Sequence, residues 1–212
     1  MQLIGMLDSP YVRRVAISLR LLEVPFEHRS VSVFSTFEQF RQINPVVKAP
    51  SLVCDDGEVL MDSTLILDYA EALAAPGRTL MPSSISERQH ALRVIGLALA
   101  ACEKTVQIVY ERQLRPAEKQ HQPWIDRVQG QLLAAYGALE SEVRRRPLEA
   151  SSKAIGQAGV TSAVAWQFTQ MMLPEVVSAS AHPELQAFST QAEQLPEFLA
   201  APPIGPGVPA NP

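Results

Sequence analysis

QLIGMLDSPYVRRVAISLRLL, the stretch at residues 2–22, decides the fold of the front of the chain. Gln2 to Leu7 is short and apolar, which is typical of a buried strand. Asp8-Ser9-Pro10 then marks a helix start, because serine caps helices and proline fits their first position. From Tyr11 onward, apolar residues recur at helical spacing, at Val12, Val15, Ala16, Leu19 and Leu22. We expect the other side of this helix to carry the polar residues Arg13, Arg14 and Arg20.

The next residues continue the alternation of strands and helices. The patterns predict a strand at His28–Val33, a weak helix at Thr36–Ile43, strands at Ser51–Cys54 and Glu58–Met61, and a helix at Ser63–Leu73. Asp56-Gly57 supplies the positive φ angles of a tight hairpin, so the last two strands should be antiparallel neighbours. The order βαβ, α, ββ, α predicts an α/β thioredoxin-like domain, a small mixed sheet with helices on both faces.

The rest of the chain shows no strand pattern. Prolines, serines and a glycine over residues 76–86 indicate a linker. Helical patterns follow at about Glu87–Arg115, Trp124–Val143, Thr161–Leu173 and Pro183–Gln194. After Pro196 the density of prolines predicts no regular helix or ladder. We therefore expect a thioredoxin-like domain at 1–75, a linker at 76–86, an all-α helical bundle domain at 87–201 and a Pro-rich tail at 202–212.

Composition excludes several classes of function. The 212 residues are 47% hydrophobic and 19% charged, with a formal net charge of −4, so there is no broad basic surface for nucleic acid. No window approaches the ~20 apolar residues of a membrane span, and the N-terminus does not resemble a secretory signal. The two cysteines are far apart, which suits a reducing compartment, so we expect a cytoplasmic protein. Four histidines without paired spacing predict no metal, at His28, His90, His121 and His182.

Three short motifs lie at turns of the predicted thioredoxin-like domain. Ser9-Pro10-Tyr11, Ala49-Pro50 and Asp62-Ser63 make the chain resemble the cytosolic glutathione transferases over nearly its whole length, in particular bacterial members with a serine at the thiol site. The resemblance implies an enzyme of detoxification that transfers alkyl or aryl groups other than methyl, with glutathione as co-substrate. It also implies a cytoplasmic homodimer that has a small electrophile as its second substrate and no metal, nucleic acid or membrane partner.

Ser9 is the residue to which the resemblance assigns catalysis. Taken alone, Ser9 also fits a plain helix cap, and the two roles are compatible. The resemblance adds a bound thiol beside its hydroxyl, where a hydrogen bond and the helix dipole favour thiolate. Lowering a thiol pKa of ~8.5 by two units needs about 2.7 kcal/mol, which these two effects together supply. Met6 occupies the region where tyrosine-type members place their phenol, so Tyr11 is the only phenolic rival nearby.

The resemblance assigns the remaining glutathione contacts to two turns. Ala49 before a cis Pro50 binds the cysteinyl backbone, and Lys48 reaches a carboxylate; the alternative is an ordinary turn. Asp62 pairs with the γ-glutamyl ammonium, while Ser63 and the helix amides bind its α-carboxylate; the alternative is a helix cap at Ser63. Glutamate or glutamine is more usual than Asp62, and aspartate is one methylene shorter.

The second substrate is expected between the domains, although the sequence does not identify it. Tyr11, Gln107 and Tyr110 are the candidates for its pocket, and they are equally well explained as surface or interface residues. A serine at position 9 disfavours glutathione-dependent reduction, because thiol exchange needs a sulfur nucleophile, and Cys54 is expected to be an inert buried thiol. The alternative to a transferase is a non-catalytic ligand carrier or protein-interaction module with the same fold.

Overall fold

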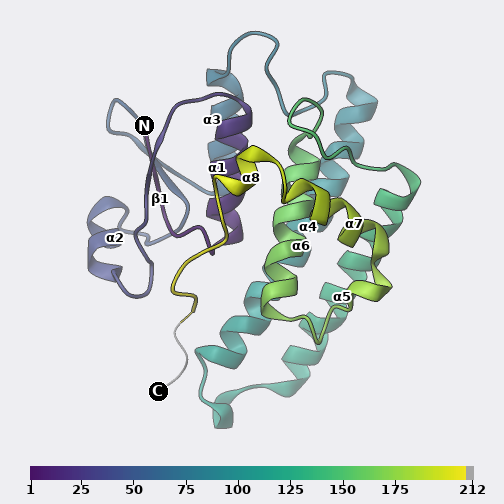
Figure 1. The fold of residues 1–212 in the computed structure, drawn as a ribbon. Helices are drawn as coiled ribbons and strands as arrows, with labels where there is room; N and C mark the ends of the chain where they lie inside the picture. Colours follow the sequence, from purple (N-terminus) through teal and green to yellow (C-terminus); the bar gives the residue numbers. More distant parts are fainter. Residues whose placement is uncertain (209–212) are drawn as a thin grey trace. The chain divides into compact units, whose positions relative to one another are not determined.

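The computed structural model describes residues 1–208 and divides them into two compact units. The first unit comprises Met1–Leu80 together with the C-terminal segment Pro196–Pro206, and the second unit contains Met81–Leu195. Figure 1 shows the strands and α1–α3 of the first unit in purple and blue, and the helices α4–α7 of the second in teal to yellow.

A four-stranded sheet lies at the centre of the first unit, with strand order β2-β1-β3-β4. β1 (Gln2–Ile4) pairs in parallel with β2 (Glu27–Arg29) and antiparallel with β3 (Ser51–Val53). β3 pairs antiparallel with β4 (Val59–Met61), so the expected hairpin is confirmed. Leu3 and Leu52, opposite each other at the middle of the sheet, are fully buried.

The turn of that hairpin differs in detail from the expectation. Gly57 has a φ of 89°, whereas Asp56 stays at negative φ. The Gly57 amide donates to the Cys54 carbonyl at 3.1 Å, and the Cys54 amide donates to the Glu58 carbonyl at 2.8 Å. A single left-handed glycine after a tight turn therefore closes the hairpin, and the prediction of positive φ at both residues was wrong.

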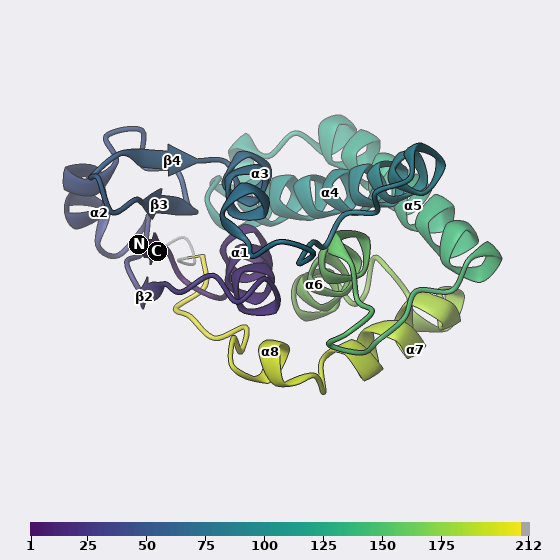
Figure 2. The same ribbon diagram turned by 90° about the horizontal axis from the view of Figure 1, so that it is seen from above.

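Three helices cover the two faces of the sheet. Figure 2 shows α2 (Phe37–Ile43) on one side and α1 (Pro10–Leu21) and α3 (Ser63–Leu73) on the other. Phe40 of α2 is fully buried and packs with Ile4 of the sheet. With β1, β2 and the hairpin, these helices give the predicted order βαβαββα, and the thioredoxin-like fold is confirmed.

The prediction of a polar face on α1 was wrong for two of its three arginines. Arg13 and Arg14 are each only 2% exposed, whereas Arg20 is exposed. Residues 12–19 of α1 are all buried, because α3 covers one side of the helix and the C-terminal segment covers another. The long arginine side chains bury their stems and direct the guanidinium groups to polar partners.

The C-terminal segment also differs from the expectation. A short helix, α8 (Pro196–Leu199), forms where prolines predicted none, and it belongs to the first unit rather than to the helical bundle. Phe198 is 1% exposed, and the Arg13 guanidinium lies 5.6 Å from its ring centre. Arg13 Nε also donates to the Ala201 carbonyl at 2.8 Å. These contacts to α1 outweigh the low helix propensity, and Pro196 itself fits a helix start. Residues 209–212 of the expected tail lie outside the described residues.

The second unit is built from helices, as predicted. The main ones are α4 (Ile85–Gln113), α5 (Gln122–Arg145), α6 (Gln157–Met172) and α7 (Pro183–Ala192). Single 3-10 turns lie at Ala117–Lys119 and Ala179–Ala181. α6 begins four residues before the expected start, so Thr161 lies inside the helix, where its hydroxyl donates to the Gln157 carbonyl at 2.7 Å.

A hydroxyl network lies in the core of this unit. The Tyr136 hydroxyl lies 2.9 Å from the Ala165 carbonyl, to which it donates, and 2.6 Å from the Thr169 hydroxyl. Thr169 is also 2.8 Å from the Thr105 hydroxyl, so α4, α5 and α6 share one network. Burial raises the pKa of Tyr136 well above its ordinary value of 10.0, which keeps the phenol neutral.

The Glu142 carboxylate binds three basic side chains of the second unit. It accepts hydrogen bonds from Arg93 at 2.7 Å, Arg145 at 2.5 Å and His90 at 3.3 Å, and the glutamate side chain is 10% exposed. The hydrogen bonds from Arg93 and then Arg145 lower the pKa of Glu142 from 4.5 to about 2. A lowered carboxyl pKa stabilises the fold above pH 4.5, and this stabilisation is lost as the pH falls through about 2.

Glu142→Gln is therefore expected to destabilise the protein by about 2 kcal/mol at pH 7, a figure reduced because the two arginines are partly exposed. As the pH falls from 4.5 to 2, the difference in the free energy of unfolding between Glu142→Gln and the wild-type protein should shrink toward zero. Urea unfolding across this range measures it, with the exposed Glu103→Gln as a control for loss of one surface charge. A difference that did not vary with pH would show that Glu142 stabilises by packing instead.

Candidate functional site

Three turns of the first unit meet at one end of its sheet, and they carry all the predicted glutathione contacts. A Cβ built on Gly5, just after β1, would lie 3.3 Å from the Ala49 side chain and 2.6 Å from Val12 of α1. Lys48 Nζ is 3.5 Å from the Asp62 carboxylate. Thus the turn before α1, the turn before β3 and the start of α3 are neighbours.

Ser9 occupies the N-cap position of α1. Its backbone is extended, with φ −73° and ψ 121°, its amide donates to the Met6 carbonyl at 3.1 Å, and its carbonyl accepts from the Arg13 amide at 2.9 Å. The Ser9 hydroxyl makes no capping hydrogen bond, and Pro10 fills the first helical position. The explanation of Ser9 as a side-chain cap is therefore wrong, and the hydroxyl lies beside the positive end of a 12-residue helix.

The turn before β3 is held from within the protein. The Ala49-Pro50 peptide bond is cis, as the resemblance implied. Asn44, only 4% exposed, donates to the Ser51 hydroxyl at 2.8 Å, and Ser51 in turn donates to the Lys48 carbonyl at 2.8 Å. No sequence pattern predicts these two hydrogen bonds, because Asn44 before Pro45 is typical of the end of a helix.

The start of α3 has its cap one residue earlier than the expected alternative. Asp62, not Ser63, is the N-cap, and its carboxylate accepts from the Thr64 amide at 2.9 Å. Asp62 has a φ of 73°, a left-handed conformation that only a few per cent of non-glycine residues adopt. Ser63 is the first helical residue and is 4% exposed.

Arg14 is the residue of this region that the sequence analysis missed. Its Nη1 lies 3.1 Å from the Ser63 hydroxyl and 3.3 Å from the Thr64 hydroxyl, and in both pairs Arg14 is the donor. It therefore joins the helix that follows Ser9 to the start of α3. Consecutive arginines on a helix with an apolar stripe were the available signal, because two adjacent side chains point in different directions.

The predicted second-substrate residues are distributed over both units. Tyr11 is half-buried at the first turn of α1. Gln107 and Tyr110 lie on α4 of the second unit, where Gln107 donates to Glu103 at 2.6 Å and Tyr110 is 41% exposed. Their shared pocket with Ser9 stays a prediction.

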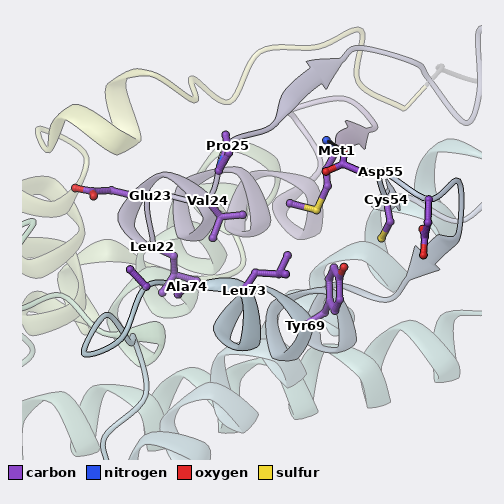
Figure 3. A pocket seen from close by; sticks show the side chains of 12 residues that line it. Met1, Leu22, Glu23, Val24, Pro25, Cys54, Asp55, Tyr69, Leu73 and Ala74 are labelled. Carbon is purple, nitrogen blue, oxygen red and sulfur yellow. Dashed lines mark hydrogen bonds and ion pairs between the residues drawn. The ribbon is translucent and has the colours of Figure 1, made fainter.

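Cys54 lines a separate pocket of about 490 Å³. Figure 3 shows Cys54, from the end of β3, and Tyr69, from α3, on the same side of this pocket. Cys54 is 8% exposed, and burial raises its pKa, an effect that a hydrogen bond with Tyr69 partly offsets. A thiol with a raised pKa is mostly protonated at neutral pH, which agrees with the expected inert thiol.

Two features are absent from residues 1–208. These residues contain no group of three or more histidine, cysteine, aspartate or glutamate side chains arranged to hold a metal ion. None of their helices combines the length and the apolar character needed to cross a membrane.

Sequence comparison relates the first unit to known proteins. Residues 3–78 match the family glutathione S-transferase, N-terminal domain. The GST-like protein YibF of Escherichia coli K12 is 31% identical over 121 residues, which cover 57% of this chain and 58% of YibF. A probable maleylacetoacetate isomerase of Caenorhabditis elegans is 36% identical over 90 residues, which cover 42% of this chain and 41% of that protein. The chain thus aligns with less than two thirds of the length of these curated relatives.

Structural comparison extends the likeness to both units. A glutathione transferase family member from Pseudomonas fluorescens Pf-5, solved with bound glutathione, is 29% identical, with a TM-score of 0.82. The match covers 96% of this chain and 99% of that one. Residues 3–78 thus match the N-terminal domain of glutathione S-transferases, and the chain as a whole is similar in fold to a glutathione transferase family member.

Proposed function

We propose that this protein is a glutathione transferase whose first unit binds glutathione and whose Ser9 hydroxyl stabilises the glutathione thiolate. The observation that carries the proposal is the Ser9 hydroxyl, which does not cap its helix although it lies at the N-cap. A thiolate placed there would accept its hydrogen bond and would benefit from the α1 dipole. The Pseudomonas fluorescens relative with bound glutathione supports the choice of ligand.

The rest of glutathione fits the charges of the other two turns. Asp62 provides a carboxylate for the γ-glutamyl ammonium, and Ser63 with the α3 amides provides donors for its α-carboxylate. Ala49 and Pro50 offer backbone groups to the cysteinyl residue, and Lys48 offers a cation to a ligand carboxylate. In this proposal the thiolate sulfur attacks a small electrophile and forms a thioether, and the leaving group departs with the displaced electron pair.

The finer parts of the proposal concern the second substrate and the assembly. Tyr11, Gln107 and Tyr110 are proposed to contact the electrophile, and the protein is proposed to act as a cytoplasmic homodimer. Nothing in this arrangement requires a metal or a nucleic acid. The alternative, a ligand carrier or interaction module, would use the same fold. The one observation that favours it is that the Asp62 carboxylate already accepts a hydrogen bond from the Thr64 amide.

Lys48 provides the test of glutathione binding. The Lys48–Asp62 pair spans 3.5 Å between side chains 51% and 45% exposed, so it contributes little to stability. Glutathione brings an ammonium for Asp62 and a carboxylate for Lys48, so the pair exchanges partners on binding. Lys48→Ala is therefore expected to weaken glutathione binding about tenfold at low salt, and less at high salt.

Calorimetric titration of glutathione measures this effect, together with thiolate ultraviolet absorbance of the bound ligand. Arg41→Ala is the matched control, because it removes an exposed cation of the same unit that pairs with Glu38. Saturable binding with a thiolate signal supports the transferase proposal. Absence of glutathione binding to the wild-type protein would refute it and would favour the carrier.

A further inference from the structure

Two consecutive arginines of α1 are buried to the same extent but contact different segments of the first unit. Arg13 contacts the C-terminal segment, at the Ala201 carbonyl and the Phe198 ring. Arg14 contacts the first turn of α3, at the hydroxyls of Ser63 and Thr64. Arg14 is 2% exposed, so its charge lies inside the first unit, directly behind the helix start to which the proposed function assigns a ligand carboxylate.

The direction of the hydrogen bond to Ser63 is fixed by chemistry. A guanidinium has five N–H donors and no acceptor, so the Ser63 oxygen must accept from Arg14. The hydroxyl proton of Ser63 then points away from Arg14. A serine whose oxygen is occupied in this way is left as a donor, which is the role that binding a carboxylate requires.

The positive charge of Arg14 also favours binding of a carboxylate at the start of α3. A cation behind the N-terminus of α3 adds to the positive potential of the helix amides, and its effect is stronger because burial reduces screening by water. Arg14 remains separated from the ligand by Ser63. It is therefore a positioning residue, which would act through the serine hydroxyl and through its field.

We propose that Arg14 tunes the start of α3 for the α-carboxylate of the γ-glutamyl group, by orienting the Ser63 hydroxyl as a donor. This inference rests on the proposed function, because it assumes that glutathione binds at the three turns. It goes further by assigning recognition of one carboxylate to a buried residue that does not touch it. A γ-glutamyl thiol is thereby distinguished from a thiol without that carboxylate.

A ligand that lacks only this carboxylate tests the proposal. 4-Aminobutyryl-cysteinylglycine is glutathione without the α-carboxylate of its glutamyl group, and the wild-type protein is expected to bind it about 30-fold more weakly than glutathione. Arg14→Met is expected to bind glutathione about tenfold more weakly than the wild-type protein, while binding of the analogue changes less than twofold. The preference for the carboxylate thus falls from about 30-fold to a few-fold, as measured by calorimetric titration.

Three further variants separate positioning from a structural role. Arg13→Met is the matched control, because it removes an adjacent arginine of equal burial whose contacts lie on the C-terminal segment, and it should keep the wild-type preference. Arg14→Lys keeps the charge but loses the planar fork, so it should restore part of the preference. Ser63→Ala should lose the preference as Arg14→Met does, and combining the two changes should add little. If Arg14→Met does not fold, Arg14→Lys and Ser63→Ala carry the same test.

The outcomes separate the two levels of the proposal. Equal weakening of both ligands by Arg14→Met, or an unchanged preference in Arg14→Lys, would overturn the role of Arg14 and leave the proposed function intact. An unchanged preference in Ser63→Ala would overturn this inference together with the assignment of Ser63 to the α-carboxylate, while the proposal that glutathione binds at the three turns would stand. A wild-type protein that binds neither ligand would overturn the proposed function and this inference with it.

Discussion

Ser9→Ala is expected to slow glutathione conjugation about 25-fold at neutral pH, because losing the hydroxyl donor raises the pKa of the bound thiol by about two units and lowers its thiolate fraction. The reason lies in the geometry of Ser9, whose hydroxyl does not cap α1 and so is available for a ligand. Because no cap is lost, the variant should keep its stability to within about 0.5 kcal/mol. Glutathione should still bind, through the contacts of the other two turns.

The pH dependence of this variant identifies the group that is affected. In the wild-type protein the bound thiol should ionise with a pKa about two units below the ~8.5 of a free thiol, and in Ser9→Ala the pKa should return toward the free value. The thiolate absorbance of the glutathione complex measures it, alongside kcat/KM for an aryl halide. Raising the pH should then recover most of the activity that Ser9→Ala loses.

Tyr11→Phe is the control for this experiment, since Tyr11 provides the rival hydroxyl two residues away. It should leave the thiol pKa unchanged. If the thiol pKa rose to the free value of ~8.5 in Tyr11→Phe and stayed low in Ser9→Ala, the stabilisation of the thiolate would be assigned to Tyr11 instead. If the rate and the thiol pKa were unchanged in both variants, neither hydroxyl would stabilise the thiolate, and the dipole of α1 would be the remaining explanation.

Local patterns predicted the first unit well because its elements are short and strongly marked. The apolar run that begins at Gln2 predicts β1, although β1 ends at Ile4 and not at Leu7, and Gly57 marks the turn between β3 and β4. The cis bond at Ala49-Pro50 followed from the resemblance and not from the residues themselves, since the sequence of an X-Pro pair does not determine its isomer.

Contacts between distant residues were beyond such patterns. Arg13 is buried by Phe198 and Ala201, which lie near the other end of the chain, so a helical wheel of α1 alone assigns Arg13 to the surface. Asn44 is also buried by a contact that its own helix does not predict, because its hydrogen bond to Ser51 forms only when β3 packs beside the end of α2. The polar residues that position the candidate site are thus those whose partners come from other elements, and periodicity carries no information about them.

Glu140 provides a third example, and its substitution is expected to have the largest effect on stability. Glu140→Ala should destabilise the protein by about 3 kcal/mol, because it leaves one buried and one partly buried amide of α7 without an acceptor. The Glu140 carboxylate, in α5, accepts from the Glu184 amide at 3.0 Å and from the Leu185 amide at 3.0 Å. The N-cap of α7, His182, makes no side-chain capping bond, so a glutamate 44 residues earlier performs that task.

The conservative variant distinguishes capping from packing. Glu140→Gln keeps the size of the side chain and one acceptor oxygen, but its amide nitrogen would face a second N–H donor, so it should cost about 2 kcal/mol. Urea unfolding followed by circular dichroism measures both variants, with the exposed Glu149→Ala as a control. Hydrogen exchange at the Glu184 and Leu185 amides should accelerate in both Glu140 variants. A loss below about 1 kcal/mol with unchanged exchange would mean that water replaces the carboxylate, and that α7 is held by its buried Leu185 and Phe188 instead.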